Sequence, residues 1–462
     1  MKYSTLTTLA ASLTLAGCMN LAPAYDTPAA PVPDTVSTDA AADPAVASTE
    51  ALTQAQALTW VQAPALQQVL ALALSHNRDL KIAWANIEKA RAQYGVQRAD
   101  LLPSINASGQ ASRSRTNAAT SNQFSAQIGF TSYELDLWGR VRNLNDAALQ
   151  QFLQTTVNQR SVEITLLADV ANAWLTLAAD QARLQLAQDT LSARRKAFEL
   201  TQRMHALGAS SGLVLAQNQT TVDSARADVA AYASQVEQGR NALQLLVGGA
   251  LPAHLLPPPL TSAMPPSAAL LELPTPLPSS LLLARPDIQA AEHALRAATA
   301  HIGAARAALF PSISLTAAAG SASRDLSGLF DSGSGTWSFA PQIRLPIFDG
   351  GRNQANVRVA QANQQLALAQ YEKTVQTAFK EVADALAERA HWSERLAAQA
   401  SLVAATQKAL TLSEARFKAG ADDYLTVLDA QRSLYAAQQT HIALRLAEQV
   451  NRITLYKVLG GG

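Results

Sequence analysis

The sequence predicts a mainly helical protein with a small membrane β part, built from a duplicated unit that joins a strand hairpin to a very long helix. Two runs, 140–207 and 352–419, contain neither Gly nor Pro and are rich in Ala, Leu, Gln and Glu, which helix interiors prefer. Four shorter segments alternate apolar and polar residues, as half-buried strands do. The same landmarks occur twice along the chain at a fixed offset, which indicates the duplication.

The duplication is visible in the residues that border the long runs. The motif Trp-Gly-Arg at 138–140 lies 212 positions before Gly-Gly-Arg at 350–352. Gly208 likewise lies 212 positions before Gly420. The chain therefore consists of two copies of one unit of about 180 residues, each with the same order of elements.

The N-terminus predicts a lipoprotein signal peptide over residues 1–17. Lys2 precedes an apolar run that is too short to span a membrane as a helix, and the run ends in Leu-Ala-Gly before Cys18. This ending resembles the bacterial lipobox, which implies cleavage before Cys18, the only cysteine, and attachment of acyl and diacylglycerol lipid to it. Met19, where an Asp would indicate retention in the inner membrane, implies the outer membrane. The alternative is an ordinary export signal in which Cys18 is removed or idle.

Residues 18–60 and 61–250 are the predicted lead-in and first repeat. The lead-in is rich in Pro, Ala, Thr, Ser and Asp, which predicts an extended, lipidated segment. In the repeat, Pro103 ends a periodic apolar pattern, and alternating segments follow as far as Gly139. The predicted elements are helices at about 65–77, 79–101, 140–207 and 213–247, with strands at about 104–116 and 123–137.

Residues 251–285 are a predicted linker that cannot be a continuous helix, because ten of the twenty prolines lie between 252 and 286. The second repeat covers 286–462. Its predicted elements are helices at about 287–309, 352–419 and 425–459, with strands at about 312–324 and 335–348. In each repeat one long helix leads away from the hairpin and a shorter one returns. We therefore expect a two-legged antiparallel rod with a helical turn at its far end.

The alternating segments have the length and pattern of outer-membrane strands, with Phe124, Phe130, Trp337 and Phe339 facing lipid. The alternative is a soluble sheet whose apolar face meets a core. Against it, no amphipathic helix is left to cover the sheet, and the opposite face is small and hydrophilic. Four strands cannot close a barrel, and an open sheet edge cannot lie in lipid. Several chains must therefore share one barrel, although the residues do not fix their number.

Composition and motifs give no sign of an enzyme. The formal net charge of +1 offers no reason to propose a nucleic-acid partner. Residues 208–212 match Gly-x-Ser-x-Gly by letter, but a long helix precedes them where a nucleophile elbow needs a strand. The seven histidines are scattered, so no metal site is expected, and no glycine-rich phosphate loop is present. We expect no cofactor apart from the lipid on Cys18.

Motifs along nearly the whole chain resemble those of the TolC-like outer-membrane efflux channels. The resemblance is closest to the NodT-like lipoprotein branch, which serves resistance-nodulation-division (RND) pumps. The motifs are Leu-Ala-Gly-Cys at 15–18, Tyr-Glu-Leu-Asp-Leu-Trp-Gly-Arg at 133–140, Arg-Pro-Asp-Ile at 285–288, Leu-Phe-Pro-Ser at 309–312, Pro-Ile-Phe-Asp-Gly-Gly-Arg at 346–352, Arg-Phe-Lys-Ala-Gly at 416–420 and Tyr-Leu-Thr-Val-Leu-Asp-Ala-Gln-Arg at 424–432.

This resemblance implies a homotrimer in the cell outer membrane that extends into the periplasm. It implies a shared twelve-stranded barrel, a tunnel of twelve helices, and an equatorial collar from the linker and the termini. The implied partners are a periplasmic adaptor (membrane fusion) protein and an inner-membrane RND-type transporter. The implied function is passive conduction of small molecules and drugs out of the cell.

The resemblance also implies a periplasmic gate at Leu425, Asp429 and Arg432. Three copies of Asp429 around an axis would form a carboxylate ring that attracts cations. Some relatives carry a second acidic residue three positions earlier, where this chain has Thr426.

Candidate contacts at the tips of the helical turns are Gly208, Gly420, Asp422 and Asp423. For the last two residues, the alternative is that they merely cap the returning helix.

The predicted function is the outer-membrane channel of a tripartite efflux pump. The alternative is a periplasmic coiled-coil scaffold or adaptor lipoprotein, which explains the helices and Cys18. It does not explain two hairpins with uncovered apolar faces in one chain.

Overall fold

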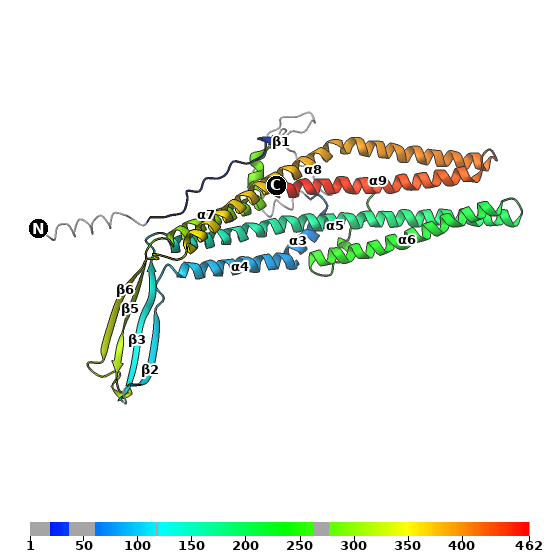
Figure 1. Ribbon diagram of the computed structural model, residues 1–462. Coiled ribbons are helices and arrows are strands. Elements are labelled where there is room, and N and C mark those ends of the chain that lie inside the picture. Colours follow the sequence, from blue (N-terminus) through cyan, green and yellow to red (C-terminus); the bar gives the residue numbers. More distant parts are fainter. Residues whose placement is uncertain (1–18, 37–60, 117–118, 262–276, 462) are drawn as a thin grey trace. The chain divides into compact units, whose positions relative to one another are not determined.

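The computed structural model describes residues 19–36, 61–116, 119–261 and 277–461 (Figure 1). Cys18, the predicted lipidation site, lies outside these ranges. The elements are β1 (Thr35–Val36), α3 (Pro64–His76), α4 (Arg78–Ala99), β2 (Asn106–Thr116), β3 (Ala119–Leu135), α5 (Arg140–Ala206), α6 (Gly212–Val247), η1 (Ala253–Leu255), β4 (Leu277–Pro278), η2 (Ser279–Ala284), α7 (Pro286–Ala307), β5 (Ser312–Ser323), η3 (Leu326–Gly328), β6 (Gly335–Arg344), α8 (Arg352–Lys418) and α9 (Tyr424–Val458).

The described chain divides into two compact units that cut across the two sequence repeats. One unit takes Met1–Ala30, Trp84–Asn158 and Asp287–Thr374, and the other takes Pro31–Ala83, Gln159–Pro286 and Val375–Gly462. Each unit thus draws on both repeats. The cause is helix length, because a helix of 67 residues such as α5 spans about 100 Å, far more than one compact core.

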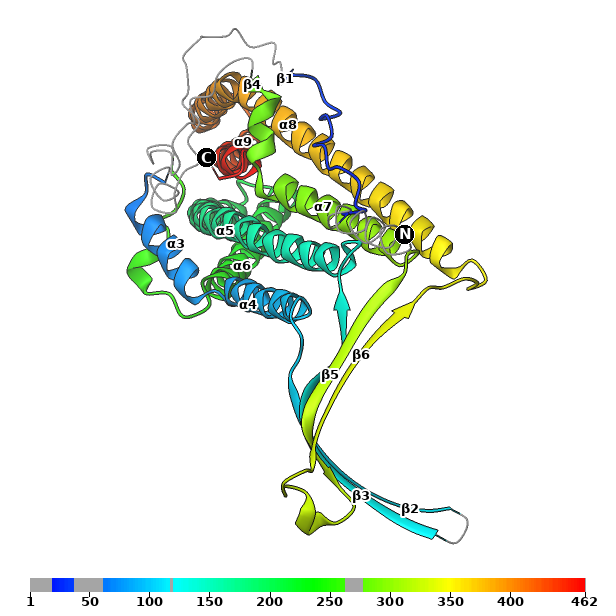
Figure 2. The same cartoon turned by 90° about the vertical axis from the view of Figure 1, so that its left-hand side faces the viewer.

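The first unit contains a single four-stranded antiparallel sheet in the order β2-β3-β5-β6 (Figure 2). The β3–β5 pairing joins the hairpins of the two repeats, and its register runs from Phe124 opposite Ser323 to Leu135 opposite Ile313. A register shift between Phe130 and Tyr133 interrupts it. At this bulge Ser132 has a φ of 56°, in the left-handed region that residues other than glycine adopt uncommonly.

The sheet has one apolar face and one small, polar face. Ala107, Ile128, Ala319 and Trp337 lie side by side across the four strands, and direct cross-strand partners share a face. The adjacent row, on the other face, is Ser108, Gln127, Gly320 and Thr336. Trp337 is 81% exposed, and every residue of β6 is exposed. Among the residues that the structure describes, none covers the apolar face at β6.

The largest differences between the predicted and the observed strand limits occur at two places. The sequence predicts that the last strand reaches residue 348, but β6 ends at Arg344. The ladder ends there because Arg344 lies opposite Ser312, which is the first residue of the partner strand β5. The second strand begins at Ala119 instead of about 123, since the register with β2 continues up to the Thr116–Ala119 pair.

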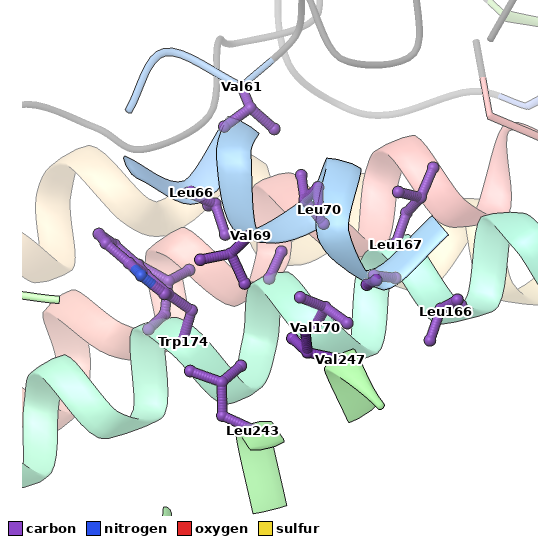
Figure 3. Packing of buried hydrophobic residues seen from close by; sticks show 14 of the residues in the cluster. Val61, Leu66, Val69, Leu70, Leu166, Leu167, Val170, Trp174, Leu243 and Val247 are labelled. Carbon is purple, nitrogen blue, oxygen red and sulfur yellow. The ribbon is translucent and has the colours of Figure 1, made fainter. Parts of the chain in front are cut away.

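The second unit has a hydrophobic core around the short helix α3 (Figure 3). Val69 and Leu70 of α3 are fully buried against α5 and α6, and Trp174 of α5 donates its Nε1–H to the Leu255 carbonyl at 3.0 Å. An 18-residue window of α5 is apolar enough to cross a membrane, with a mean hydropathy of 1.4, but 61% of that window is buried within the protein. This part of α5 is a core helix.

Two polar side chains of the second unit bind the ends of the returning helices. Asn77, between α3 and α4, donates its side-chain amide to the Leu246 carbonyl near the end of α6 at 2.7 Å. In the second repeat, Arg285 donates to the Val458 carbonyl at the end of α9 at 2.7 Å. In both repeats, therefore, a polar side chain before the helix that leads to the hairpin binds the end of the returning helix.

Candidate functional site

The second helical turn, between α8 and α9, is closed by charged side chains. Gly420 takes a φ of 73°, which glycine adopts without strain. The Arg416 guanidinium binds both carboxylate oxygens of Asp422, at 2.6 and 2.8 Å, and this hydrogen-bonded partner lowers the pKa of the Asp422 carboxyl. Asp423 is the N-cap of α9, and its Oδ1 accepts from the backbone N–H of Thr426 at 3.1 Å.

The proposed tip contacts in this turn thus have structural partners. Asp423 caps the returning helix, as the alternative interpretation expects, while Asp422 forms an ion pair across the turn instead of a cap. The Thr426 hydroxyl also donates to Asp423, at 3.0 Å. Thr426 is therefore engaged in the cap of α9.

The three proposed gate residues lie along one face of α9. Their spacings of four and three residues place them above one another on a helix. Arg432 donates to Asp429 at 3.0 Å, and both side chains are more than half exposed, at 54% and 62%. Leu425 is 43% exposed, whereas the neighbouring Val427 is buried. Because Val427 packs on the buried face of α9, the proposed gate residues lie on the exposed face of the α8–α9 pair.

The first helical turn, between α5 and α6, has a different chemistry. Ser211 caps α6 by accepting from the Val214 N–H at 3.2 Å, and the His205 ring hydrogen-bonds to the Ser210 carbonyl at 2.8 Å. Gly208 has a φ of 74°, and the preceding Leu207 is 85% exposed. This turn therefore presents an apolar side chain and no carboxylate, whereas the second turn presents an ion pair.

The four proposed membrane-facing aromatics share the apolar face of the sheet. Trp337 and Phe339 are exposed, while Phe124 and Phe130 are half-buried against their neighbours. Phe130 lies opposite Ala317, which lies opposite Phe339. Small alanines between large aromatic side chains leave an open apolar groove on this face.

The N-terminal segment is tied to the base of the sheet in the first unit. The Met19 backbone N–H donates to the Leu137 carbonyl at 3.1 Å, just beyond the end of β3. Asn20 accepts from the Asn143 side chain at 2.8 Å, and Tyr25 donates to Glu292 of α7 at 3.2 Å. The residue that precedes Met19 is Cys18.

Sequence reasoning missed a cluster formed by Arg194, Asp228 and Tyr435. The Tyr435 hydroxyl donates to Asp228 at 3.1 Å, and the Arg194 guanidinium lies 5.4 Å from the centre of the Tyr435 ring. The three residues come from α5, α6 and α9 and share no spacing or motif in the sequence. No signal in the chain could have brought them together before the helices were placed. In the described ranges, no group of three His, Cys, Asp or Glu side chains gathers as a metal site would require.

The sequence model of a family described as outer membrane efflux protein matches residues 69–249 and 277–461. The chain belongs to this family. The match leaves out residues 250–276, which include the proline-rich segment between the repeats. The family is one of efflux channels and not of enzymes.

Relatives match over the full length of the chain. The toluene efflux pump outer membrane protein TtgC of Pseudomonas putida is 44% identical, with 100% of this chain and 96% of that protein aligned. The cation efflux system protein CusC of Escherichia coli is 41% identical over 98% of each chain. The prediction of an efflux protein of the outer membrane is confirmed.

Solved structures of outer-membrane channels have the same fold. A crystal structure of CusC, described in terms of transmembrane channel formation, covers 96% of this chain and 100% of that one, with a TM-score of 0.86 and 40% identity. The open state of the Neisseria gonorrhoeae MtrE outer membrane channel covers 96% and 98%, with a TM-score of 0.83 and 36% identity. The chain is therefore an outer-membrane efflux channel, which favours this prediction over the scaffold alternative.

Proposed function

We propose that three copies of this chain form the exit duct of a tripartite efflux pump, in which a twelve-stranded barrel continues into a twelve-helix periplasmic tunnel. The observation that carries the proposal is the four-stranded sheet with exposed apolar side chains and two unpaired edge strands, β2 and β6. Lipid can accept the apolar face, but it cannot satisfy the backbone groups of an open edge. Only neighbouring copies can pair those edges.

The number of strands supports a trimer. One chain supplies four strands, so two chains would give a barrel of about eight, whose interior side chains fill. Three chains give a wall of twelve strands, wide enough to leave a passage lined by the small, polar face of each sheet. The row Ser108, Gln127, Gly320 and Thr336 would then face water.

The partners in the proposal are a periplasmic adaptor protein and an inner-membrane RND-type transporter, which would supply the energy. Relatives are named as outer-membrane proteins of toluene and antibiotic efflux pumps, and one belongs to a cation efflux system. We therefore propose small molecules as the exported class. The helical turns at Gly208 and Gly420 are the proposed contacts with the adaptor, since Leu207 gives the first turn an exposed apolar side chain.

The proposed periplasmic gate consists of Leu425, Asp429 and Arg432. Each copy carries an exposed carboxylate that one guanidinium contacts at 3.0 Å, which leaves its second oxygen available. Three such pairs around an axis would form a narrow charged ring, with the leucines as an apolar layer beside it. Rings of carboxylates favour cations, so the closed duct should conduct cations weakly.

We also propose that Cys18 carries the lipid that anchors the N-terminus. The hydrogen bond from Met19 to the Leu137 carbonyl supports this, because it holds Met19, the residue that follows Cys18 in the sequence, at the base of the sheet, where a membrane surface would lie. Stable anchoring needs more than one acyl chain, which a lipidated bacterial N-terminus supplies. Mass spectrometry of the mature N-terminus tests it: an unmodified terminus beyond Cys18 would refute the anchor.

Planar-bilayer recording tests the duct itself. The purified protein should migrate as a trimer after mild detergent extraction and give small, cation-preferring currents. Trp337 fluorescence should be quenched by brominated lipid in proteoliposomes, measured as the difference between the unmodified protein and Trp337→Phe. A monomer without currents, in which lipid does not reach Trp337, would contradict the proposal.

A further inference from the structure

Arg194 of α5 is a charged side chain in an apolar setting. Its exposed fraction is only 7%, and it lies between Leu191 and Phe198, which belong to a hydrophobic cluster with Val222 and Ala225 of α6. Burial lowers the pKa of the Arg194 guanidinium, and the nearby Arg432 lowers it further. An arginine in this position needs partners, because burying an uncompensated charge is costly.

The partners of Arg194 come from two other helices. Its Nη1 donates to the Thr221 carbonyl of α6 at 2.9 Å, and its guanidinium lies over the ring of Tyr435 of α9 at 5.4 Å. A guanidinium over an aromatic face within about 6 Å is an attractive contact, and it is stronger when water is excluded. Arg194 therefore connects the helical hairpin of the first repeat to α9 of the second repeat.

Tyr435 is held at both ends of its side chain. Arg194 covers its ring, while its hydroxyl donates to Asp228 of α6 at 3.1 Å. Burial and the Asp228 charge raise the pKa of Tyr435 to about 12, so the phenol keeps its proton and remains a donor at neutral pH. A ring fixed at its face and at its hydroxyl can neither slide nor turn without breaking one of the two contacts.

This arrangement sets the rotation of α9 about its own axis. Tyr435 follows Arg432 by three residues and Asp429 by six, which is about 4.5 and 9 Å along a helix. Each residue step turns a helix by about 100°, so fixing Tyr435 also fixes the direction of the side chains one and two turns earlier. The aim of the exposed Asp429–Arg432 pair thus depends on the contacts of Tyr435.

Stability alone does not explain the cluster. A buried charge contributes little to the free energy of folding, and apolar replacements of similar volume are often neutral or better. We propose that Arg194, Asp228 and Tyr435 form a lock, hereafter the α9 lock, which holds α9 in the rotation that keeps the periplasmic gate closed. The proposal rests on the proposed duct function. Its three members are positioning residues that act on conduction through the direction of Asp429 and Arg432.

Three variants test the lock, and each changes a residue on a different helix. Tyr435→Phe removes only the hydroxyl and keeps the ring beneath Arg194. Asp228→Ala removes the acceptor of the same hydrogen bond, and Arg194→Met removes the charge while keeping an apolar side chain of similar reach. The control is Thr440→Val on α9, because the Thr440 hydroxyl bonds only to the Ala436 carbonyl of its own helix.

The readouts are single-channel conductance and the cation-to-anion permeability ratio in planar bilayers, with trimer melting measured in detergent. Tyr435→Phe should raise the open-to-closed ratio about fivefold, the factor expected for one lost buried hydrogen bond, and lower the cation preference. Asp228→Ala should match it, and the double variant should add little, because both changes break the same bond. Arg194→Met should open the gate as well, while melting stays close to that of Thr440→Val.

Two results would overturn the lock. One is that Tyr435→Phe and Asp228→Ala, as folded trimers, conduct like the unmodified protein while Asp429→Ala opens the gate. The other is that their effects add fully in the double variant. Failure of the duct proposal is distinguishable, because the unmodified protein and Asp429→Ala would then both be silent. If Tyr435→Phe does not assemble into a trimer, the conductances of Arg194→Met and Asp228→Ala test the lock: unchanged conductance in both variants would overturn it.

Discussion

Trp138 stacks on Phe310, with ring centroids 4.8 Å apart and planes inclined by 27°. Trp138 follows β3 in the first repeat, and Phe310 precedes β5 in the second. The Trp138 Nε1–H also donates to the carbonyl of Pro311 at 2.8 Å. One side chain thus fixes the two repeats to each other at the base of the β3–β5 pairing, beside a cavity that it shares with Arg140 and Arg352.

We expect Trp138→Ala to destabilise the sheet by up to about 3 kcal/mol, because it removes both the stack and the hydrogen bond. Trp138→Phe should cost about 1 kcal/mol, since it keeps part of the stack but has no N–H to donate. Urea unfolding of the detergent-solubilised protein measures both. Trp337→Ala is the matched control, because that tryptophan is 81% exposed. Equal losses at the two tryptophans would contradict the assignment of Trp138.

Asp429→Ala should increase conductance at least about twofold and reduce the cation preference, because it removes the carboxylate from the proposed ring. Asp423→Ala is the control on the same helix. It removes the N-cap of α9, which costs about 1 kcal/mol of helix stability, but it leaves Asp429 in place. Planar-bilayer recordings of both variants distinguish a gate carboxylate at Asp429 from a helix cap at Asp423. If only Asp423→Ala lost the cation preference, the assignment of Asp429 to the gate would be contradicted.

The second helical turn should loosen in acid. The Arg416 ion pair lowers the pKa of Asp422 below its ordinary value of 3.8 in the folded protein. The pair therefore stabilises the turn fully above about pH 3.8 and is lost as the pH falls through the lower, folded value. A spin label at Ala421→Cys should become more mobile only as the pH falls below about 3.8. In the Asp422→Asn variant the label should be mobile at every pH. If the label's mobility did not depend on pH when Asp422 is present, the stabilising role of the ion pair would be refuted.

Gly248→Ala should destabilise the second unit. Gly248 ends α6 with a φ of 85°, and an added Cβ would lie 2.5 Å from the carbonyl oxygen of His76. The left-handed conformation alone costs a residue with a Cβ about 1 kcal/mol, and the contact with the backbone adds to this. Gly249→Ala is the neighbouring control, because nothing lies within 4 Å of its Cβ position. Thermal unfolding should separate the two variants, and equal midpoints would contradict the argument.

The fold class was accessible from the sequence because its signals are local. A run such as 140–207, which has no Gly or Pro and is rich in helix-forming residues, predicts a helix. The alternation around Trp337 places the apolar side chains on one face only if the segment is a strand. The pairing of β3 with β5 was not accessible, since it joins residues such as Phe130 and Ala317 that are far apart in sequence. Strand ends were also uncertain, because the same alternation continues past Arg344, where the partner strand β5 offers no further residue to pair with.

At the candidate gate, too, some features could be predicted from the sequence and others could not. Its place on α9 followed from the motif that resembles the family, and the Asp429–Arg432 pair follows from a spacing of three residues on one helix. The α9 lock could not be predicted, because Arg194 and Tyr435 are 241 positions apart and carry no mutual pattern.

By itself, the sequence determined the duplicated order of elements, the two faces of the strands and the position of the lipobox-like cysteine. These features depend on neighbours a few residues apart, which the chain order fixes. Only the tertiary structure decided which strand pairs across the repeats, which helix end meets which, and that a buried arginine holds α9 by a tyrosine. Such contacts arise where separate helices and strands are packed together, and the free energy that selects them comes from that packing and not from any local pattern.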